Sequence, residues 1–146
     1  APPQGSWRDL FWHEVRAHVD PQRVHFVGRI PHATLLHVLR LSHAHVYLTY
    51  PFVLSWSMLE AMAVQAPIVG SDTAPVREVI THDQNGLLVD FFSPEAIAEA
   101  ALACLSDPKR RQRLGQAARE TIVSRYDLQR VCLPQHVALL EDWAAR

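Results

Sequence analysis

Short apolar runs separated by turn residues divide the first 90 residues of the chain. Four of these runs are rich in strand-forming residues and are closed by glycine, proline or another turn residue, which predicts short β-strands rather than buried helical turns. The four predicted strands are Val24–Val27, His45–Leu48, Ala66–Gly70 and Leu87–Val89. Helical patterns lie between them. Strands alternating with helices predict an α/β fold, with an open parallel sheet of about four strands flanked by helices.

Apolar residues at helical spacing mark the predicted helices. Before the last strand, they are Trp7 to about Val19, Ala33 to Ser42, a helix opened by Ser55, and a short turn over Val76–Ile80. After residue 92 the pattern is helical throughout. Helices are predicted to begin at Ser93-Pro94, at Asp107-Pro108 and at Asp127, because aspartate or serine caps a helix and proline suits its first turn. The first of them should bury Ile97, Ala101, Leu102 and Leu105, and Pro134 should kink or split the last.

The stretch from His45 to Met62 carries the main functional prediction. Its strand passes into a helix through a short turn, with Ser55 as the predicted N-cap. At the carboxyl end of a parallel strand, the free N–H groups of such a helix form a ready anion site, and phosphate is the usual occupant.

Glu60 follows about one turn inside that helix, and its side chain should tilt back toward the helix start. A carboxylate beside a phosphate pocket makes sense if it accepts hydrogen bonds from sugar hydroxyls, as an acidic residue does in dinucleotide sites. The alternative is a glutamate that only favours the helix dipole. Spacing alone favours this second interpretation.

Composition excludes several classes of protein. The chain has 146 residues, 49% hydrophobic and 20% charged, with a net charge of −1. This balance predicts no nucleic-acid partner, and no apolar run is long enough to predict a membrane span. The two cysteines, Cys104 and Cys132, fit a reducing, cytoplasmic compartment. The nine histidines lack the spacing of a metal site, and the basic run 109–113 is expected to be a solvated helix face.

The ordered set of segments from Val24 to about Tyr126 resembles the carboxy-terminal domain of the group 1 retaining glycosyltransferases, which have the GT-B fold. The segments that carry the resemblance are VHFVG at 24–28, HVYL at 45–48, LEAMA at 59–63, PIV at 67–69, PVREVI at 75–80 and NGLLV at 85–89. The resemblance implies a Rossmann-like sheet, half of a GT-B fold, with a helical carboxy-terminal segment. It implies one nucleotide-sugar-binding domain over residues 1–146.

Roles for individual residues follow from the resemblance. It implies that Glu60 accepts hydrogen bonds from the ribose of a nucleotide diphosphate sugar, of UDP or GDP type. It implies that the turn binds the diphosphate through the backbone amides of Ser55, Trp56 and Ser57, with Leu54 beside them as a further donor-binding residue. It also implies that Arg29 and Ile30 line the base. No metal or other cofactor is expected.

The chain departs from the family pattern in two places. Phe52 occupies the position of a second glutamate that contacts the donor sugar, and Val53-Leu54-Ser55 replaces the usual Gly-Phe-Gly. No strand with a basic phosphate clamp precedes Trp7, and the amino-terminal acceptor domain is not represented. The expectation is therefore a carboxy-terminal fragment, inactive alone, which can dimerise through an exposed sheet edge. The alternatives are a domain of a nucleotide-sugar epimerase and a non-enzymatic α/β nucleotide-binding module.

Overall fold

The chain forms two compact units, Ala1–Pro31 and His32–Arg146. The structure, a computed structural model, describes residues 5–50 and 53–146. In the first unit, α1 spans Trp7–Val15 and a 3₁₀ turn spans Pro21–Arg23. Ser6 and Asp9 form a capping box at the start of α1, which satisfies two backbone donors that a helix start leaves unpaired. The helix ends before the predicted Val19 and buries none of its residues.

The predicted strand Val24–Val27 is wrong: the segment has no regular secondary structure. Strand formers need a neighbouring strand to accept and donate the ladder hydrogen bonds, and no described residue supplies one. Phe26 and Val27 are 54% and 60% exposed. The ring of Phe26 instead packs edge-on against Trp12, with the ring centroids 5.5 Å apart.

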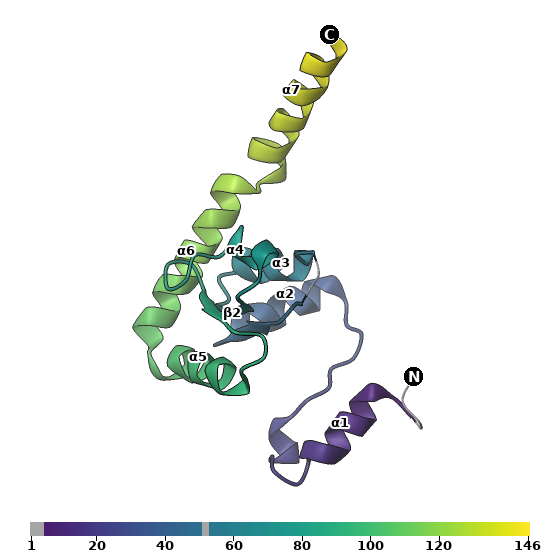
Figure 1. Cartoon of the computed structure of the whole chain (residues 1–146), viewed down its shortest axis with the longest axis vertical. Helices are drawn as coiled ribbons and strands as arrows, with labels where there is room; N and C mark the ends of the chain where they lie inside the picture. Colours follow the sequence, from purple (N-terminus) through teal and green to yellow (C-terminus); the bar gives the residue numbers. More distant parts are fainter. Residues whose placement is uncertain (1–4, 51–52) are drawn as a thin grey trace. The chain divides into compact units, whose positions relative to one another are not determined.

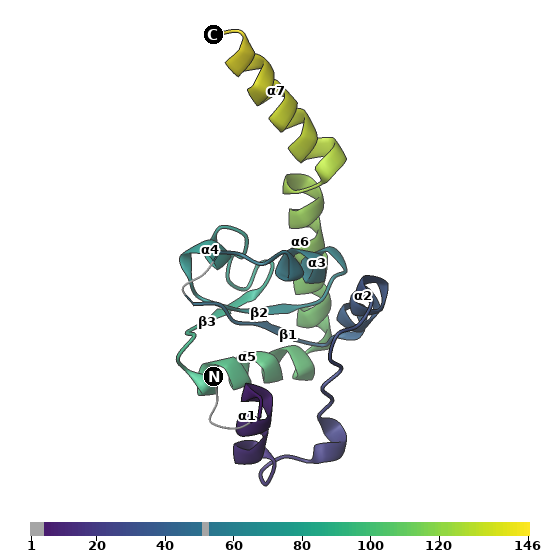
Figure 2. The same cartoon turned by 90° about the vertical axis from the view of Figure 1, so that its right-hand side faces the viewer.

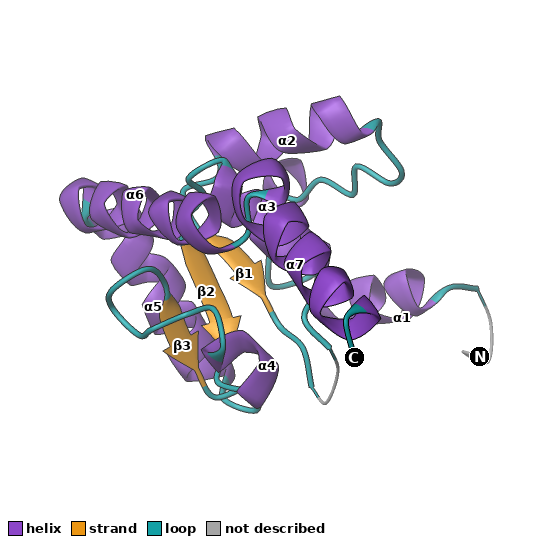
Figure 3. Ribbon diagram, turned by 90° about the horizontal axis from the view of Figure 1, so that it is seen from above, coloured by secondary structure: helices purple, strands orange, loops and turns teal. Residues whose placement is uncertain are grey.

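The second unit is built on a parallel sheet of three strands, one fewer than predicted. Figures 2 and 3 show the strands lying side by side, in the order β1-β2-β3. The strands are His45–Tyr47, Ile68–Ser71 and Leu87–Val89, with Val46 paired to Val69 and Val69 to Leu87. The four-residue strand β2 lies in the middle and is buried along its whole length, as expected for a parallel strand covered on both faces.

Helices cover both faces of this sheet, as Figure 2 shows, with α3 and α4 on one face and α5 on the other. One core cluster joins Ile68 of β2 to Met58 and Met62 of α3. The second cluster joins Val69 to Cys104 of α5. Consecutive residues of a strand face opposite sides, so Ile68 and Val69 each lie in one of the two clusters.

The helices of this unit up to residue 125 are α2 (His32–Leu41), α3 (Trp56–Ala63), α4 (Ala74–Arg77), α5 (Pro94–Ser106) and α6 (Pro108–Arg125).

The inward face of α5 differs from the prediction. Ile97 packs against the second cluster together with Ala96 and Ala100, whereas Leu102 and Leu105 are 61% and 51% exposed. The buried stripe therefore runs through small residues to Cys104 and avoids the large leucines.

The carboxy-terminal segment leaves the sheet. Asp127 caps it as predicted, by accepting hydrogen bonds from the backbone N–H groups of Gln129 and Arg130. The predicted single helix is divided into a π-helical turn, Leu128–Cys132, and α7, Leu133–Ala144. Proline lacks an N–H and opens a new helix better than it continues one, so the break lies at Pro134 as expected. Figures 1 and 2 show α7 extending beyond α6, and none of its residues is buried.

Candidate functional site

The turn between β1 and α3 is organised by hydroxyl groups. Ser55 has an extended backbone and caps α3: its Oγ accepts a hydrogen bond from the N–H of Ser57, at 3.3 Å. The N–H of Ser55 donates to the hydroxyl of Tyr47 at 2.8 Å. The last residue of β1 therefore holds the cap of α3 in place. The cap was predicted, but the contact from Tyr47 was not, because it joins residues in two different elements.

A second hydroxyl ties the carboxyl ends of β1 and β2 together. The buried Oγ of Ser71 accepts from the N–H of Thr49 at 3.0 Å and donates to the carbonyl of the same residue at 2.9 Å. The chain leaving β1 is thus fixed to the end of β2 just before the turn that leads to α3. These hydrogen bonds fix the backbone at the carboxyl ends of the strands. Ligands of open α/β sheets usually bind at this edge.

Two of the three amides predicted to bind a diphosphate have protein partners in this structure. The N–H of Ser55 donates to Tyr47, and that of Ser57 makes the 3.3 Å contact with Ser55 Oγ. For Trp56, no described residue accepts from the N–H, and the side chain is 83% exposed. Leu54 is partly buried and packs against the first core cluster. Phe52 lies outside the described residues.

Glu60 is the fifth residue of α3, about one turn inside the helix as predicted. Its side chain is 33% exposed, and its Oε1 lies 2.8 Å from Nε2 of His32, the first residue of α2. The carboxylate is thus neither buried in the core nor fully solvated. It also borders an otherwise mostly apolar recess of about 190 Å³, which is lined by Trp56, Leu59, Glu60, Ala63, Ile122 and Tyr126. A carboxylate held at the surface beside an exposed indole can accept hydrogen bonds from a polar ligand.

The two residues predicted to line the base lie in the first unit. Arg29 is exposed and Ile30 is partly buried, after Gly28 with a φ of 62°. Their assignment to a nucleotide site stays a prediction.

Three aromatic side chains beside the carboxyl ends of β1 and β3 were not singled out from the sequence. Tyr50 stacks on Phe91 with the centroids 5.5 Å apart, and Phe92 meets both rings edge-on, at 5.1 and 5.0 Å. Tyr50 and Phe92 remain 56% and 68% exposed. The available signal was the pair of phenylalanines that begins two residues after the end of β3.

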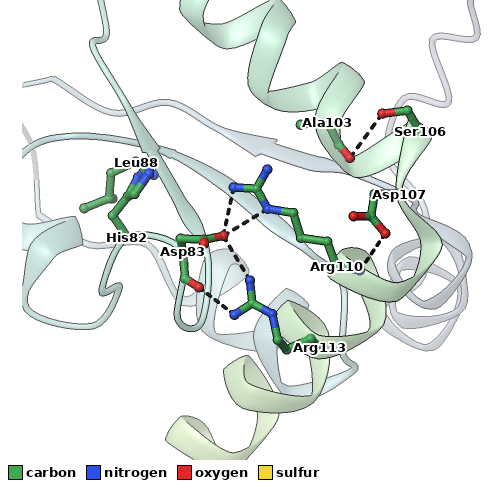
Figure 4. A network of polar contacts seen from close by, with 8 residues as sticks. All are labelled: His82, Asp83, Leu88, Ala103, Ser106, Asp107, Arg110 and Arg113. Atoms are coloured by element: carbon green, nitrogen blue, oxygen red, sulfur yellow. Dashed lines mark hydrogen bonds and ion pairs between the residues drawn. The ribbon is translucent and has the colours of Figure 1, made fainter.

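The basic run on α6 is occupied by internal contacts, as Figure 4 shows. Arg110 and Arg113 both bind Oδ1 of Asp83, at 2.8 and 3.0 Å between guanidinium nitrogen and carboxylate oxygen. Arg113 also donates to the backbone carbonyl of Asp83 at 2.6 Å. Hydrogen bonding from Arg110, above all, lowers the pKa of the Asp83 carboxyl. These contacts hold the loop before β3 against α6, so two residues of the run that was predicted to be a solvated face have a structural role instead.

Comparison with known proteins decides the family. Residues 4–121 match the family described as glycosyl transferases group 1. The chain belongs to this family. A glycogen synthase of Mycobacterium tuberculosis is 29% identical to the group 1 chain over 128 residues, which make up 88% of the chain and 31% of the relative. A D-inositol 3-phosphate glycosyltransferase of Xylanimonas cellulosilytica is 42% identical over 60 residues, 41% of the chain and 14% of the relative.

Solved structures share the fold of this group 1 chain. Sucrose-phosphate synthase from Thermosynechococcus elongatus matches all of it with a TM-score of 0.85 and 26% identity, over 37% of that protein. The Anabaena protein HepE, in complex with UDP-glucose, matches 94% of the chain with a TM-score of 0.81 and 18% identity, over 36% of its length. The group 1 chain thus spans about a third of these relatives, and the predicted GT-B resemblance and α/β fold are confirmed.

Three further observations concern the described part of this group 1 chain. None of its helices is both long and apolar enough to cross a membrane. No group of three or more His, Cys, Asp or Glu side chains in residues 5–50 and 53–146 is arranged to hold a metal ion. A wider groove of about 940 Å³ lies along α6, next to Gln65 and Arg119, but it includes neither a helix start nor Glu60.

Proposed function

We propose that this chain is the donor-binding half of a glycosyltransferase that moves a sugar from a nucleotide diphosphate sugar to an acceptor. The observation that carries the proposal is the placement of Glu60, a half-buried carboxylate one turn inside a serine-capped helix that follows a parallel strand. The UDP and UDP-glucose named for the HepE complexes support a donor of this class. The proposal includes the assignment of residues 1–146 to one nucleotide-sugar-binding domain.

The chemistry of the site follows from its parts. The N–H groups and the dipole at the start of α3 would meet the diphosphate, with Ser57 exchanging its hydrogen bond to Ser55 for one to a phosphate oxygen. Glu60 would accept hydrogen bonds from the ribose hydroxyls. We assign Arg29 and Ile30 to the base, and Phe52 to the donor site, on the family resemblance alone. Because backbone amides stabilise the charge of the leaving diphosphate, we propose a metal-independent transfer, of the retaining type that the family resemblance implies.

The other half of the enzyme would come from an acceptor-binding domain. The chain covers 31% of the glycogen synthase it matches and 37% of the sucrose-phosphate synthase, and we propose that these 146 residues transfer no sugar on their own. In the described sheet β1 pairs only with β2, so its other edge could pair with a strand from the acceptor half or from a second copy. The two free cysteines fit the reducing compartment of a cytoplasmic enzyme.

Family membership favours this proposal over the two alternatives, an epimerase domain and a non-enzymatic nucleotide-binding module. The match to the glycosyl transferase family covers residues 4–121, which include both Glu60 and the segment Pro75–Ile80.

Calorimetric titration with UDP and GDP tests the proposal. One of the two should bind the wild-type chain and raise its stability by about 2.7 kcal/mol at a hundredfold excess over Kd. Glu60→Gln should weaken that binding, whereas the same change at Glu120, which is exposed on α6, should not. The proposal would be contradicted if neither nucleotide bound the wild-type chain. It would also be contradicted if wild type and Glu60→Gln bound the nucleotide equally well.

A further inference from the structure

A histidine from a neighbouring helix holds the carboxylate of Glu60. Nε2 of His32 lies 2.8 Å from Oε1 of Glu60. Because an ionised carboxylate only accepts hydrogen bonds, the ring nitrogen must be the donor. The contact joins the first residue of α2 to the fifth residue of α3, two helices that also pack together through Leu35, Leu36 and Leu39 of α2 and Met58, Ala61 and Met62 of α3.

The contact leaves most of the carboxylate available to a ligand. A carboxylate has about four acceptor positions, and His32 uses one of them on Oε1. No residue in the described part of the chain donates to Oε2. The side chains of His32 and Glu60 are 64% and 33% exposed, so a ligand can reach the pair from solvent. Two sugar hydroxyls could therefore bind the carboxylate while the histidine stays in place.

An ordered carboxylate binds better than a mobile one. A free glutamate side chain samples several rotamers, and a ligand that fixes them must overcome the lost entropy. A partner that restricts the side chain beforehand reduces that cost. A hydrogen-bonded pair as exposed as this one adds little to folding stability, so its main effect should be on binding.

We propose that His32 is a positioning residue for donor recognition, which orients the Glu60 carboxylate so that it accepts the ribose hydroxyls. His32 acts through Glu60 and not on the ligand directly. This inference rests on the proposed function, since it needs Glu60 to contact the ribose.

A ligand that lacks the ribose hydroxyls separates this role from a general effect on the fold. UDP and 2′,3′-dideoxy-UDP, or the GDP pair if GDP binds more tightly, are titrated into four chains: wild type, His32→Ala, His32→Gln and His37→Ala. His32→Ala should weaken binding of the ribonucleotide about three- to tenfold, the loss expected when one side chain is no longer ordered in advance. Binding of the dideoxynucleotide should not change. His32→Gln keeps an N–H donor and should recover part of the loss. His37, exposed on the same helix, is the matched control and should leave both affinities unchanged.

Combination with Glu60→Gln completes the test. If His32 acts through Glu60, then His32→Ala should have no further effect in the Glu60→Gln chain. The inference is wrong if His32→Ala weakens the binding of both nucleotides equally, or of neither. If Glu60→Gln still weakens only the binding of the ribonucleotide, the proposed function stands without the role of His32. If the wild-type chain binds no nucleotide, both fail. The two affinities are compared within each variant, so a change in overall stability cannot imitate the expected result.

Discussion

The α-carbon of Gly115 in α6 lies directly against the backbone carbonyl of Gln65, at the end of α3. A Cβ at position 115 would overlap that oxygen. Gln65 itself has a φ of 67°, a left-handed conformation that ends a helix. Arg119, one turn further along α6, donates to the carbonyl of Ala63. α6 therefore fixes the carboxyl end of the helix whose other end forms the candidate site.

Gly115→Ala should destabilise the fold by about 1–3 kcal/mol, the usual cost of forcing an extra carbon into a packed contact. The backbone at Gln65 cannot yield as a flexible side chain would, so α3 and α6 must move apart. Chemical denaturation followed by circular dichroism measures the change. Gln116→Ala, on the exposed face of the same helix, should stay within about 0.5 kcal/mol of wild type. Equal stability of the two variants would show that α6 does not depend on this close approach.

Asn85→Ala should cost about 1–3 kcal/mol, since it leaves buried backbone groups unpaired. The side chain of Asn85 is 7% exposed. It accepts from the N–H of Thr81 at 2.7 Å and donates to the carbonyl of Val79 and the hydroxyl of Thr121, both at 2.9 Å. Urea unfolding of Asn85→Ala, compared with the exposed neighbour Gln84→Ala, measures the effect. A loss no larger than that of the control would mean that water replaces these three bonds.

The stability of the chain should fall as the pH is lowered below about 6.5, the ordinary pKa of histidine. Burial lowers the pKa of His45, in β1. The unfolded chain therefore takes up the proton first, and stability that is fully present above pH 6.5 is lost as the pH falls toward the folded pKa. Thermal unfolding at pH 7.5, 6.5 and 5.5 should show a smaller decline for His45→Gln than for wild type. If the melting temperatures of wild type and His45→Gln fall equally with pH, protonation of His45 is not the cause of the decline.

A second decline should follow at lower pH. The Asp83 carboxyl, whose pKa is lowered chiefly by hydrogen bonding from Arg110, contributes stability that is present above about pH 4 and lost as the pH falls through the folded pKa. Because the side chain is 47% exposed, the contribution is small. Urea unfolding at pH 7, 5 and 3 should show that wild type is more stable than Asp83→Asn at pH 7 and that the difference disappears by pH 3. A difference between the two chains that does not change with pH would assign the acid decline to other carboxyl groups.

Local patterns predicted the parts of the fold that depend on neighbours in sequence. The limits of Leu87–Val89, the cap at Ser55 and the break near Pro134 were all predicted correctly, because each depends on a few adjacent residues. Val24–Val27 was predicted wrongly because strand propensity cannot supply a ladder partner. Leu102 was predicted to be buried because of its spacing along the helix, but the close packing of α5 on the sheet favours small residues such as Ala100.

In the candidate site too, features set by adjacent residues could be predicted, and contacts between distant residues could not. The position of Glu60 on α3 could be predicted from its distance to the cap. Its contact with His32 could not, because the two residues are far apart in sequence and only the packing of α2 on α3 brings them together. The hydroxyl of Tyr47 at the cap is a similar case. The identity of the family depended on an ordered set of segments, none of which is specific alone.

We propose that the start of α3 recognises a nucleotide diphosphate through its backbone N–H groups. Two-dimensional ¹H–¹⁵N NMR spectra of the labelled chain, recorded during titration with UDP and with GDP, test it most directly. The largest shifts should belong to the amides of Ser55, Trp56 and Ser57 and to the indole of Trp56, with a smaller shift at Glu60. Spectra that do not change with either nucleotide, or shifts confined to residues of α6 and α7, would contradict it.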